Sequence, residues 1–136
     1  MESLKSSITL PVSAEKLYKA WLSSKEHSLF TGAEAKASAK VNAKHSSWDG
    51  YIWGKNLELK AGNLPAGKAW KIVQSWRTSE FPEDAPDSIL EITFEEKAGK
   101  TKLNLYHHGL QKGDAKKYKK GWNDFYFAPM KDYYSK

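Results

Sequence analysis

The stretch of residues 114–134 constrains the fold of this chain more than any other. Its apolar side chains recur mostly three and four positions apart, which is the period of a helix with one buried face. They are Tyr118, Trp122, Phe125, Tyr126, Met130 and Tyr133. Asp114 stands where an N-cap is expected, and the lysines between positions 116 and 120 mark the solvated face. Because such an aromatic stripe needs a large concave apolar surface, the rest of the chain is expected to supply one.

Two residues fit this helix poorly. Gly121 costs roughly 1 kcal/mol relative to alanine in a helix interior. Pro129 lacks an amide donor and crowds the carbonyl of Phe125, at a cost of about 3 kcal/mol unless the helix bends. We therefore expect a bend close to Pro129.

The size and composition of the chain exclude several classes of protein. At 136 residues it is expected to form a single domain, 1–136, whose core needs no covalent support. It has no cysteine, which excludes disulfides and thiolate metal sites. No apolar run reaches the length of a signal peptide, or the roughly twenty residues of a membrane span. We expect a cytoplasmic, monomeric protein without membrane insertion.

The formal charge of +6 raises the question of nucleic-acid binding. Arg77 is the only arginine, whereas base and phosphate recognition depends on the bidentate geometry of that side chain. The lysines are scattered apart from the group at 116–120, which is typical of a solvated helix face. No nucleic-acid partner is expected.

The chain begins with a strand and two short helices. Residues 4–10 form a candidate strand that Pro11 closes. Ser13 can cap a helix whose buried face carries Ala14, Leu17, Tyr18 and Trp21. A further short helical segment is expected before the break at 31–32.

Between residues 33 and 108, short segments separated by turn residues predict strands. Asp49-Gly50 and Ala98-Gly99 predict tight hairpin turns, and residues 80–87, with two prolines and four acidic residues, predict a loop. The expected strands are 33–38, 45–48, 51–60, 68–77, 88–95 and 100–108.

Alternation assigns one face of the later strands to the core. The inward residues are expected to be Leu90, Ile92 and Phe94 on one strand, and Leu103, Leu105 and His107 on the next, with Trp70, Ile72, Gln74 and Trp76 on a third. The pattern predicts an α+β fold in which a curved antiparallel sheet of about six to seven strands wraps around a long C-terminal helix. Two short helices follow its first strand.

Several motifs in this order resemble a known family. They include Gly-Tyr-Ile-Trp-Gly at 50–54, Trp76-Arg77 followed by Phe81-Pro82, and Gly121-Trp122 in the terminal helix. Over nearly its whole length the chain resembles the C-terminal domain of the activator of the heat-shock-protein-90 ATPase and its bacterial single-domain relatives. This resemblance implies a START-like helix-grip fold, whose members hold hydrophobic small molecules between sheet and helix. Eukaryotic activators carry an additional N-terminal domain that contributes to ATPase stimulation, and we do not expect that domain within these 136 residues.

The candidate ligand-binding residues are those expected on the two inward faces. They are Gln74, Trp76, Leu90, Ile92, Leu105, His107, Trp122, Phe125, Tyr126 and Met130. The sequence is equally compatible with aromatic side chains that fill a solid core. Arg77 is expected to point outward and to pair with an acidic residue of the 80–87 loop.

No catalytic or metal-binding motif stands out. His107 lies on an apolar face, where histidine is more often a hydrogen-bonded core residue than a catalyst, and no nucleophile or third partner stands at a recognisable spacing. The four histidines lack the spacing of metal ligands, and the acidic residues of the 80–87 loop lack the pattern of a calcium loop. We expect no cofactor and no metal.

Three functions remain open from the sequence. The preferred one is a non-enzymatic protein that binds a lipid-like or polycyclic small molecule, with His107 or a tyrosine hydroxyl as its polar anchor. The second is a co-chaperone-like module that docks on a heat-shock-protein-90-type chaperone through its basic exterior and stimulates the ATPase. The third is a START-like enzyme that uses His107 as an acid or base.

Overall fold

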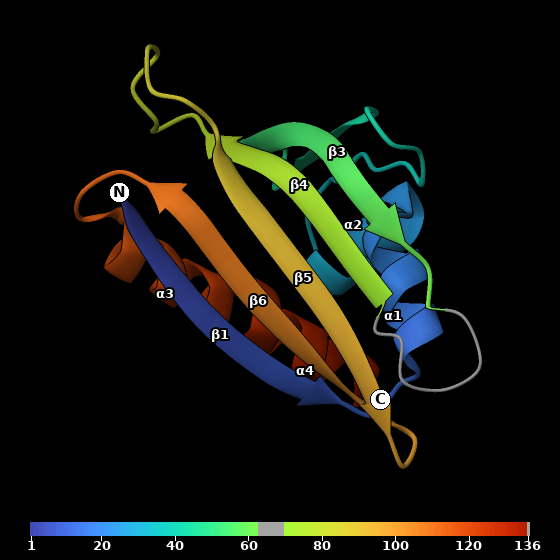
Figure 1. The fold of residues 1–136 in the computed structure, drawn as a ribbon. Coiled ribbons are helices and arrows are strands. Elements are labelled where there is room, and N and C mark those ends of the chain that lie inside the picture. The colour runs from blue at the N-terminus through green and yellow to red at the C-terminus, as the bar shows by residue number, and fades with distance from the viewer. Residues whose placement is uncertain (63–69, 136) are drawn as a thin grey trace.

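A single curved antiparallel sheet forms one layer of the molecule (Figure 1). The structure is a computed structural model that describes residues 1–62 and 70–135. Within these residues six strands pair in the order β1-β6-β5-β4-β3-β2. They are β1 (Glu2–Leu10), β2 (Lys44–Ser47), β3 (Ile52–Lys60), β4 (Trp70–Thr78), β5 (Ser88–Lys97) and β6 (Lys100–Leu110). The first two residues of the strand predicted at 68–77 lie outside the described residues.

Both predicted hairpins are present, but only the one at Ala98-Gly99 has the predicted tight turn. Lys97 pairs with Lys100 across Ala98 and Gly99, and both turn residues have positive φ, 54° and 78°. The turn between β2 and β3 is longer. There Trp48, Asp49 and Gly50 all have positive φ, which is rare for a side chain as large as tryptophan.

The strand predicted at residues 33–38 is wrong. Only Lys36 forms a bridge, with Ser46, and the neighbouring backbone is bonded elsewhere. The amides of Ala35 and Ala37 donate to the hydroxyls of Ser28 and Ser24. These two serines belong to a helix, so side-chain bonds replace the strand ladder that the alternation seemed to require.

Two short helices follow β1, as predicted. Helix α1 (Ala14–Trp21) begins at Ser13, whose hydroxyl accepts from the amide of Lys16. Helix α2 (Ser24–Thr31) ends at Gly32, with φ of 82°. Both helices lie on the concave side of the sheet, on the same side as the C-terminal helix (Figure 1).

The C-terminal helix consists of three consecutive segments. Helix α3 (Asp114–Trp122) leads into η1 (Asn123–Phe127), one turn of π-helix, and then into α4 (Ala128–Tyr134). In η1 the amide of Ala128 donates to the carbonyl of Asn123, five residues earlier. The wide turn ends two residues before Pro129, and a π-turn is one of the features at which helices kink.

Two details of the predicted helix need correction. The N-cap is Gly113, with φ of 88°, and Asp114 is the first helical residue, where its charge still favours the positive end of the helix. Phe125 is not part of the buried stripe, because its side chain is 59% exposed. The stripe follows a spacing of four through Tyr118, Trp122, Tyr126 and Met130, all of which are buried.

The predicted inward faces of β4, β5 and β6 are confirmed. Ile72, Gln74 and Trp76 are buried, as are Leu90, Ile92 and Phe94 and the set Leu103, Leu105 and His107; Trp70 is only partly buried. These side chains form the concave surface that grips the helix. The fold is an α+β helix grip. No helix in the described part of the chain is long and apolar enough to cross a membrane.

Candidate functional site

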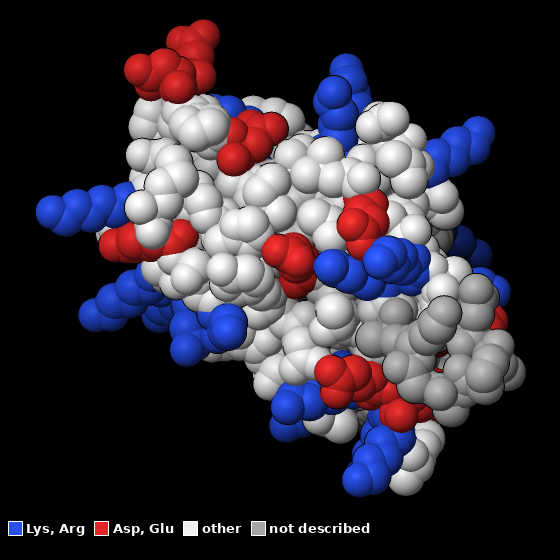
Figure 2. Space-filling model, viewed as in Figure 1, with Lys and Arg blue, Asp and Glu red and all other residues white. Residues whose placement is uncertain are grey.

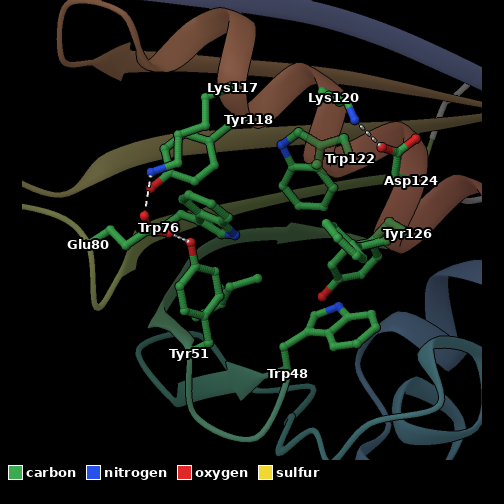
Figure 3. Close-up of a pocket in the computed structure, with 13 residues that line it drawn as sticks. Trp48, Tyr51, Trp76, Glu80, Lys117, Tyr118, Lys120, Trp122, Asp124 and Tyr126 are labelled. Carbon is green, nitrogen blue, oxygen red and sulfur yellow. Dashed lines mark hydrogen bonds and ion pairs between the residues drawn. The ribbon is translucent and has the colours of Figure 1, made fainter.

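A pocket of about 450 Å³ opens between the β2–β3 turn and the helix formed by α3 and η1 (Figure 3). This volume lies in the range of known small-molecule sites. Seven of the lining side chains are aromatic and four are charged. The lining residues are Trp48, Tyr51, Ile52, Trp76, Glu80, Lys117, Tyr118, Lys120, Gly121, Trp122, Asp124, Phe125 and Tyr126.

The inner wall is a cluster of buried rings from β4 and the C-terminal helix. The ring centroids of Trp76 and Trp122 are 5.6 Å apart, and those of Trp122 and Tyr126 are 4.7 Å apart. Tyr118 meets Trp76 edge-on at 5.1 Å. Because each ring is held by its neighbours, this wall is preformed.

The outer wall pairs Trp48 with Phe125, whose rings meet edge-on at 5.7 Å. Trp48 has φ of 53°. Its turn is fixed by Asp49, whose amide donates to the carbonyl of Glu34 and whose carboxylate accepts from the amide of Glu34. The turn therefore holds a bulky side chain in a strained backbone conformation beside the pocket, and such strain is often found at functional sites.

Charged side chains at the rim are paired with one another. Lys117 bonds to Glu80 at 2.7 Å and Lys120 to Asp124 at 3.1 Å (Figure 3). Tyr51 donates its hydroxyl to Glu80. The hydrogen bond from Lys117, followed by that from Tyr51, lowers the pKa of Glu80. Burial, followed by the hydrogen bond to Glu80, raises the pKa of Tyr51.

His107 lies beneath the pocket and does not line it. Its side chain is fully buried, and Trp122 donates its indole N–H to Nδ1 at 3.1 Å. Nδ1 therefore carries no proton, and Nε2 donates to Ser88 Oγ at 2.8 Å, while Ser88 donates to the carbonyl of Trp76 at 2.6 Å. Burial lowers the pKa of His107 to about 3. Both ring nitrogens are thus occupied in a structural chain.

A second buried histidine, which sequence reasoning missed, contacts Tyr126, one turn after Trp122 in the C-terminal helix. His27 Nδ1 is 2.9 Å from the carbonyl of Trp21, so it carries the proton. Nε2 then accepts from the hydroxyl of Tyr126 at 2.8 Å, and the oxygen of Tyr126 is 2.9 Å from Ser47 Oγ. Burial lowers the pKa of His27 to about 4. No local pattern indicates this pair, because its members are 99 residues apart.

The structure divides the predicted ligand-binding residues into two groups. Trp76, Trp122, Phe125 and Tyr126 line the pocket. The others are buried away from it: Leu90, Ile92, Leu105, His107 and Met130 in the core, and Gln74 in hydrogen bonds with Trp21 and Asn56.

Sequence reasoning also missed Trp48, Tyr51 and Tyr118 as lining residues. A signal existed for the first two, because they flank the predicted Asp49-Gly50 turn and a short turn presents the side chains next to it. Tyr118 was assigned to the helix stripe but not to a site.

The predicted ion pair of Arg77 is confirmed. Its guanidinium is 2.9 Å from the carboxylate of Asp87 and also donates to the carbonyls of Pro82 and Ala85. One side chain thus holds the 80–87 loop in place, and this loop begins at the rim of the pocket with Glu80.

Charges are mixed on the outer face of the sheet, where blue and red side chains are interspersed (Figure 2). Lys71, for example, lies between Glu58 and Glu91. In the described part of the chain no group of three or more histidine, aspartate or glutamate side chains is placed to hold a metal ion.

A curved sheet that grips a C-terminal helix, with a cavity beside that helix, defines a START-like helix-grip protein. The family model described as activator of Hsp90 ATPase homolog 1-like protein matches residues 11–135, and the chain belongs to this family. No curated protein matches the sequence.

Solved structures share the fold at low identity. An HSP90 activator from Plasmodium falciparum superposes with a TM-score of 0.78 and 23% identity, covering 94% of this chain and 92% of the other. Protein MLL2253 from Mesorhizobium loti superposes with a TM-score of 0.76 and 14% identity, covering 97% of this chain and 96% of the other. The Aha1 dimer from Colwellia psychrerythraea superposes with a TM-score of 0.76 and 15% identity, covering 98% of this chain and 96% of the other.

Proposed function

We propose that this protein binds a hydrophobic small molecule, without catalysing a reaction, in the pocket between the β2–β3 turn and the C-terminal helix. The observation that carries the proposal is the open space of about 450 Å³ whose walls are seven aromatic side chains. A solid core would have left no such space beside Trp76 and Trp122. The site differs from the sequence-based one in that His107 does not line it. Of the two predicted polar anchors only tyrosine hydroxyls remain, and the indoles of Trp48 and Trp76 lie beside them.

The distribution of polarity supports an apolar ligand. The deep wall consists of Trp76, Trp122 and Tyr126, each only 3% exposed. Charged groups occur at the rim, where they neutralise one another in pairs. Transfer of apolar surface from water into such a pocket is favourable by roughly 25 cal/mol per Å², so an apolar body would provide most of the affinity.

Gly121 offers a direct test. It lines the pocket, and a Cβ added to it meets nothing within 4 Å. We expect Gly121→Leu to place a branched side chain at the pocket and to weaken ligand binding at least tenfold, while Gly121→Ala, the matched control, keeps most of the affinity.

The measurement has two stages. Native mass spectrometry of freshly purified protein looks for a co-purifying mass, and amide chemical-shift mapping then follows titrations with fatty acids, sterol-like compounds and flavonoids. Shifts that cluster on Trp76, Trp122 and Tyr126 and vanish in Gly121→Leu would support the proposal. Binding that is equal in the two variants, or shifts remote from the pocket, would contradict it.

A second function, docking on a heat-shock-protein-90-type chaperone, is favoured by family membership and by the similarity to the Plasmodium falciparum HSP90 activator. Helix α3 presents a lysine-rich outer face on which Lys116 and Lys119 are exposed. An acidic chaperone surface would complement this face, and the complex would weaken with salt.

The test is the ATPase rate of the cognate chaperone at low salt, with and without this protein. Lys116→Glu together with Lys119→Glu is expected to remove any stimulation. Lys25→Glu, on the exposed face of α2, is the control for a change of charge elsewhere. Absence of stimulation by the unmodified protein would rule out this function for that chaperone.

Catalysis by His107 is not proposed. Both of its ring nitrogens bond within the core, and it does not line the pocket. An acid or base must reach the proton that it transfers, and His107 has no such access.

A further inference from the structure

Most polar side-chain atoms around the pocket already have partners. The hydroxyl of Tyr51 donates to Glu80, that of Tyr118 lies 2.8 Å from Thr78 Oγ1, and that of Tyr126 bonds to His27. The four charged rim groups form two ion pairs. None of these atoms needs a ligand to complete its hydrogen bonds.

Two indole N–H groups are different. Trp48 Nε1 is buried from solvent and has no hydrogen-bond partner among the described residues. Trp76 Nε1 also forms no hydrogen bond in the described part of the chain, but it is not one of the buried unpaired atoms. In Figure 3 the nitrogen-bearing edges of both rings face the space between Tyr51 and Tyr126. A buried donor without an acceptor is unfavourable, and such groups are uncommon in folded proteins.

Other tryptophans of the same aromatic cluster do have an acceptor for the indole N–H. Trp122 donates to His107 at 3.1 Å, and Trp21 donates to Gln74 at 3.3 Å. Trp21 does not line the pocket, and Trp122 lines it with its ring while its N–H donates to His107 in the core. The two unpaired donors belong to side chains that line the pocket.

The rim argues against a cationic ligand. An aromatic cage can bind cations through its ring faces, but the carboxylates of Glu80 and Asp124 are already neutralised by Lys117 and Lys120. The free side-chain groups of the pocket are therefore donors, and the complementary ligand supplies acceptors.

We infer that the ligand is a flat, ring-containing compound whose polar groups are hydrogen-bond acceptors, such as ketone or quinone oxygens, and that Trp48 and Trp76 donate to them. This inference rests on the proposed function and specifies the chemical class of its ligand. Trp48 is a specificity-determining residue in this view, and its strained backbone serves to aim the indole at the pocket.

Fluorenone and fluorene provide a matched pair of probes. They share one tricyclic frame and differ in that a carbonyl replaces a methylene group. Fluorene is the more apolar compound, so burial of apolar surface alone would favour fluorene. Donation by the indoles predicts the reverse order, with fluorenone binding at least fivefold more tightly.

The readout is the indole N–H region of the nitrogen–proton correlation spectrum, where each of the six tryptophans contributes one signal. Both aromatic probes shift nearby signals through their ring currents, but only fluorenone is expected to add the downfield shift of a hydrogen bond to the signal of Trp48 or Trp76. Trp48→Phe combined with Trp76→Phe keeps two rings but removes both donors. The double variant should therefore bind fluorenone and fluorene with about equal affinity. Trp53→Phe, outside the pocket, is the control and should keep the preference.

The outcomes separate this inference from the proposed function. If both probes bind at the pocket equally well and shift the two indole signals alike, the acceptor class is wrong while the pocket remains a binding site. If neither probe shifts any pocket signal, both the inference and the binding of polycyclic compounds are contradicted. The comparison of the two probes on the unmodified protein needs no variant, so a folding defect in the double variant cannot obscure the result.

Discussion

Two regions along the C-terminal helix, which meet at Tyr126, face the same curved sheet with opposite results, and we call them the filled end and the open end. At one end Trp21, His27 and Phe30 pack against Tyr126, and the remaining void is about 10 Å³. At the other end about 450 Å³ stays open beside Trp122. Both ends are rich in aromatic residues, so composition does not determine which one is filled.

The element that covers each end makes the difference. Helices α1 and α2 cover the filled end, and Trp21 stacks on Tyr126 at 5.2 Å. The open end is covered by the β2–β3 turn, which contributes Trp48 and Tyr51 from its own residues. A helix places successive side chains into a groove, whereas a short turn supplies too few to fill it.

The largest expected effect is the loss of stability when Trp21 is removed from the filled end. Trp21→Ala removes a ring that contacts His27, Phe30 and Tyr126, and it leaves the side-chain oxygen Oε1 of Gln74 without its indole donor. Large-to-small core changes of this kind cost about 3–5 kcal/mol of unfolding free energy. Urea denaturation measures it.

Phe125→Ala, at the open end, is the contrasting variant. Because Phe125 is 59% exposed, its removal should cost well under about 1 kcal/mol. If the two variants were equally destabilised, the distinction between a filled and an open end would fail.

The second-largest effect is expected from acid, which should lower the free energy of unfolding through His27 in the filled end. Burial lowers the pKa of His27 to about 4, whereas histidine in an unfolded chain titrates near 6.5. Between these values the unfolded state binds the proton more readily, so stability falls as the pH drops from about 6.5 to 4, by about 3 kcal/mol for this residue. His107, with a pKa lowered to about 3, adds to the loss and extends it to lower pH.

Unfolding by urea at a series of pH values tests this prediction. Ring proton shifts of His27 followed by NMR give the matching local measurement. Titration of His27 near 6.5 in the folded protein, or a stability that does not change with pH, would contradict it. The pocket at the open end has no histidine in its lining, so its shape should respond to this titration only through the shared helix.

The smallest effect has the opposite sign. Gly121→Ala adds a Cβ where nothing lies within 4 Å, in the interior of α3. Alanine is favoured over glycine in a helix by up to about 1 kcal/mol, so the variant should be more stable than the unmodified protein. Loss of stability would show that the space beside Gly121 is not open.

Much of the fold could be predicted because it follows from local patterns. Alternation gave the faces of β5 and β6, and capping by Ser13 located α1. The prediction of a strand at 33–38 failed because serine hydroxyls of α2 accept hydrogen bonds from its backbone amides, and no local pattern indicates these contacts. The prediction that Phe125 is buried failed for a related reason, because spacing alone does not show which edge of a broad apolar stripe reaches solvent.

The sequence by itself determined the aromatic stripe and the antiparallel strands, because periodicity and turn chemistry act over a few residues. The family followed from the resemblance of ordered motifs rather than from periodicity. Only the tertiary structure decided where the stripe is covered and where it is left open. It also decided that His107 is a core residue, because its partners Ser88 and Trp122 come from two other elements. Cavities and buried hydrogen bonds depend on residues distant in the chain, and their existence is settled by packing rather than by any local pattern.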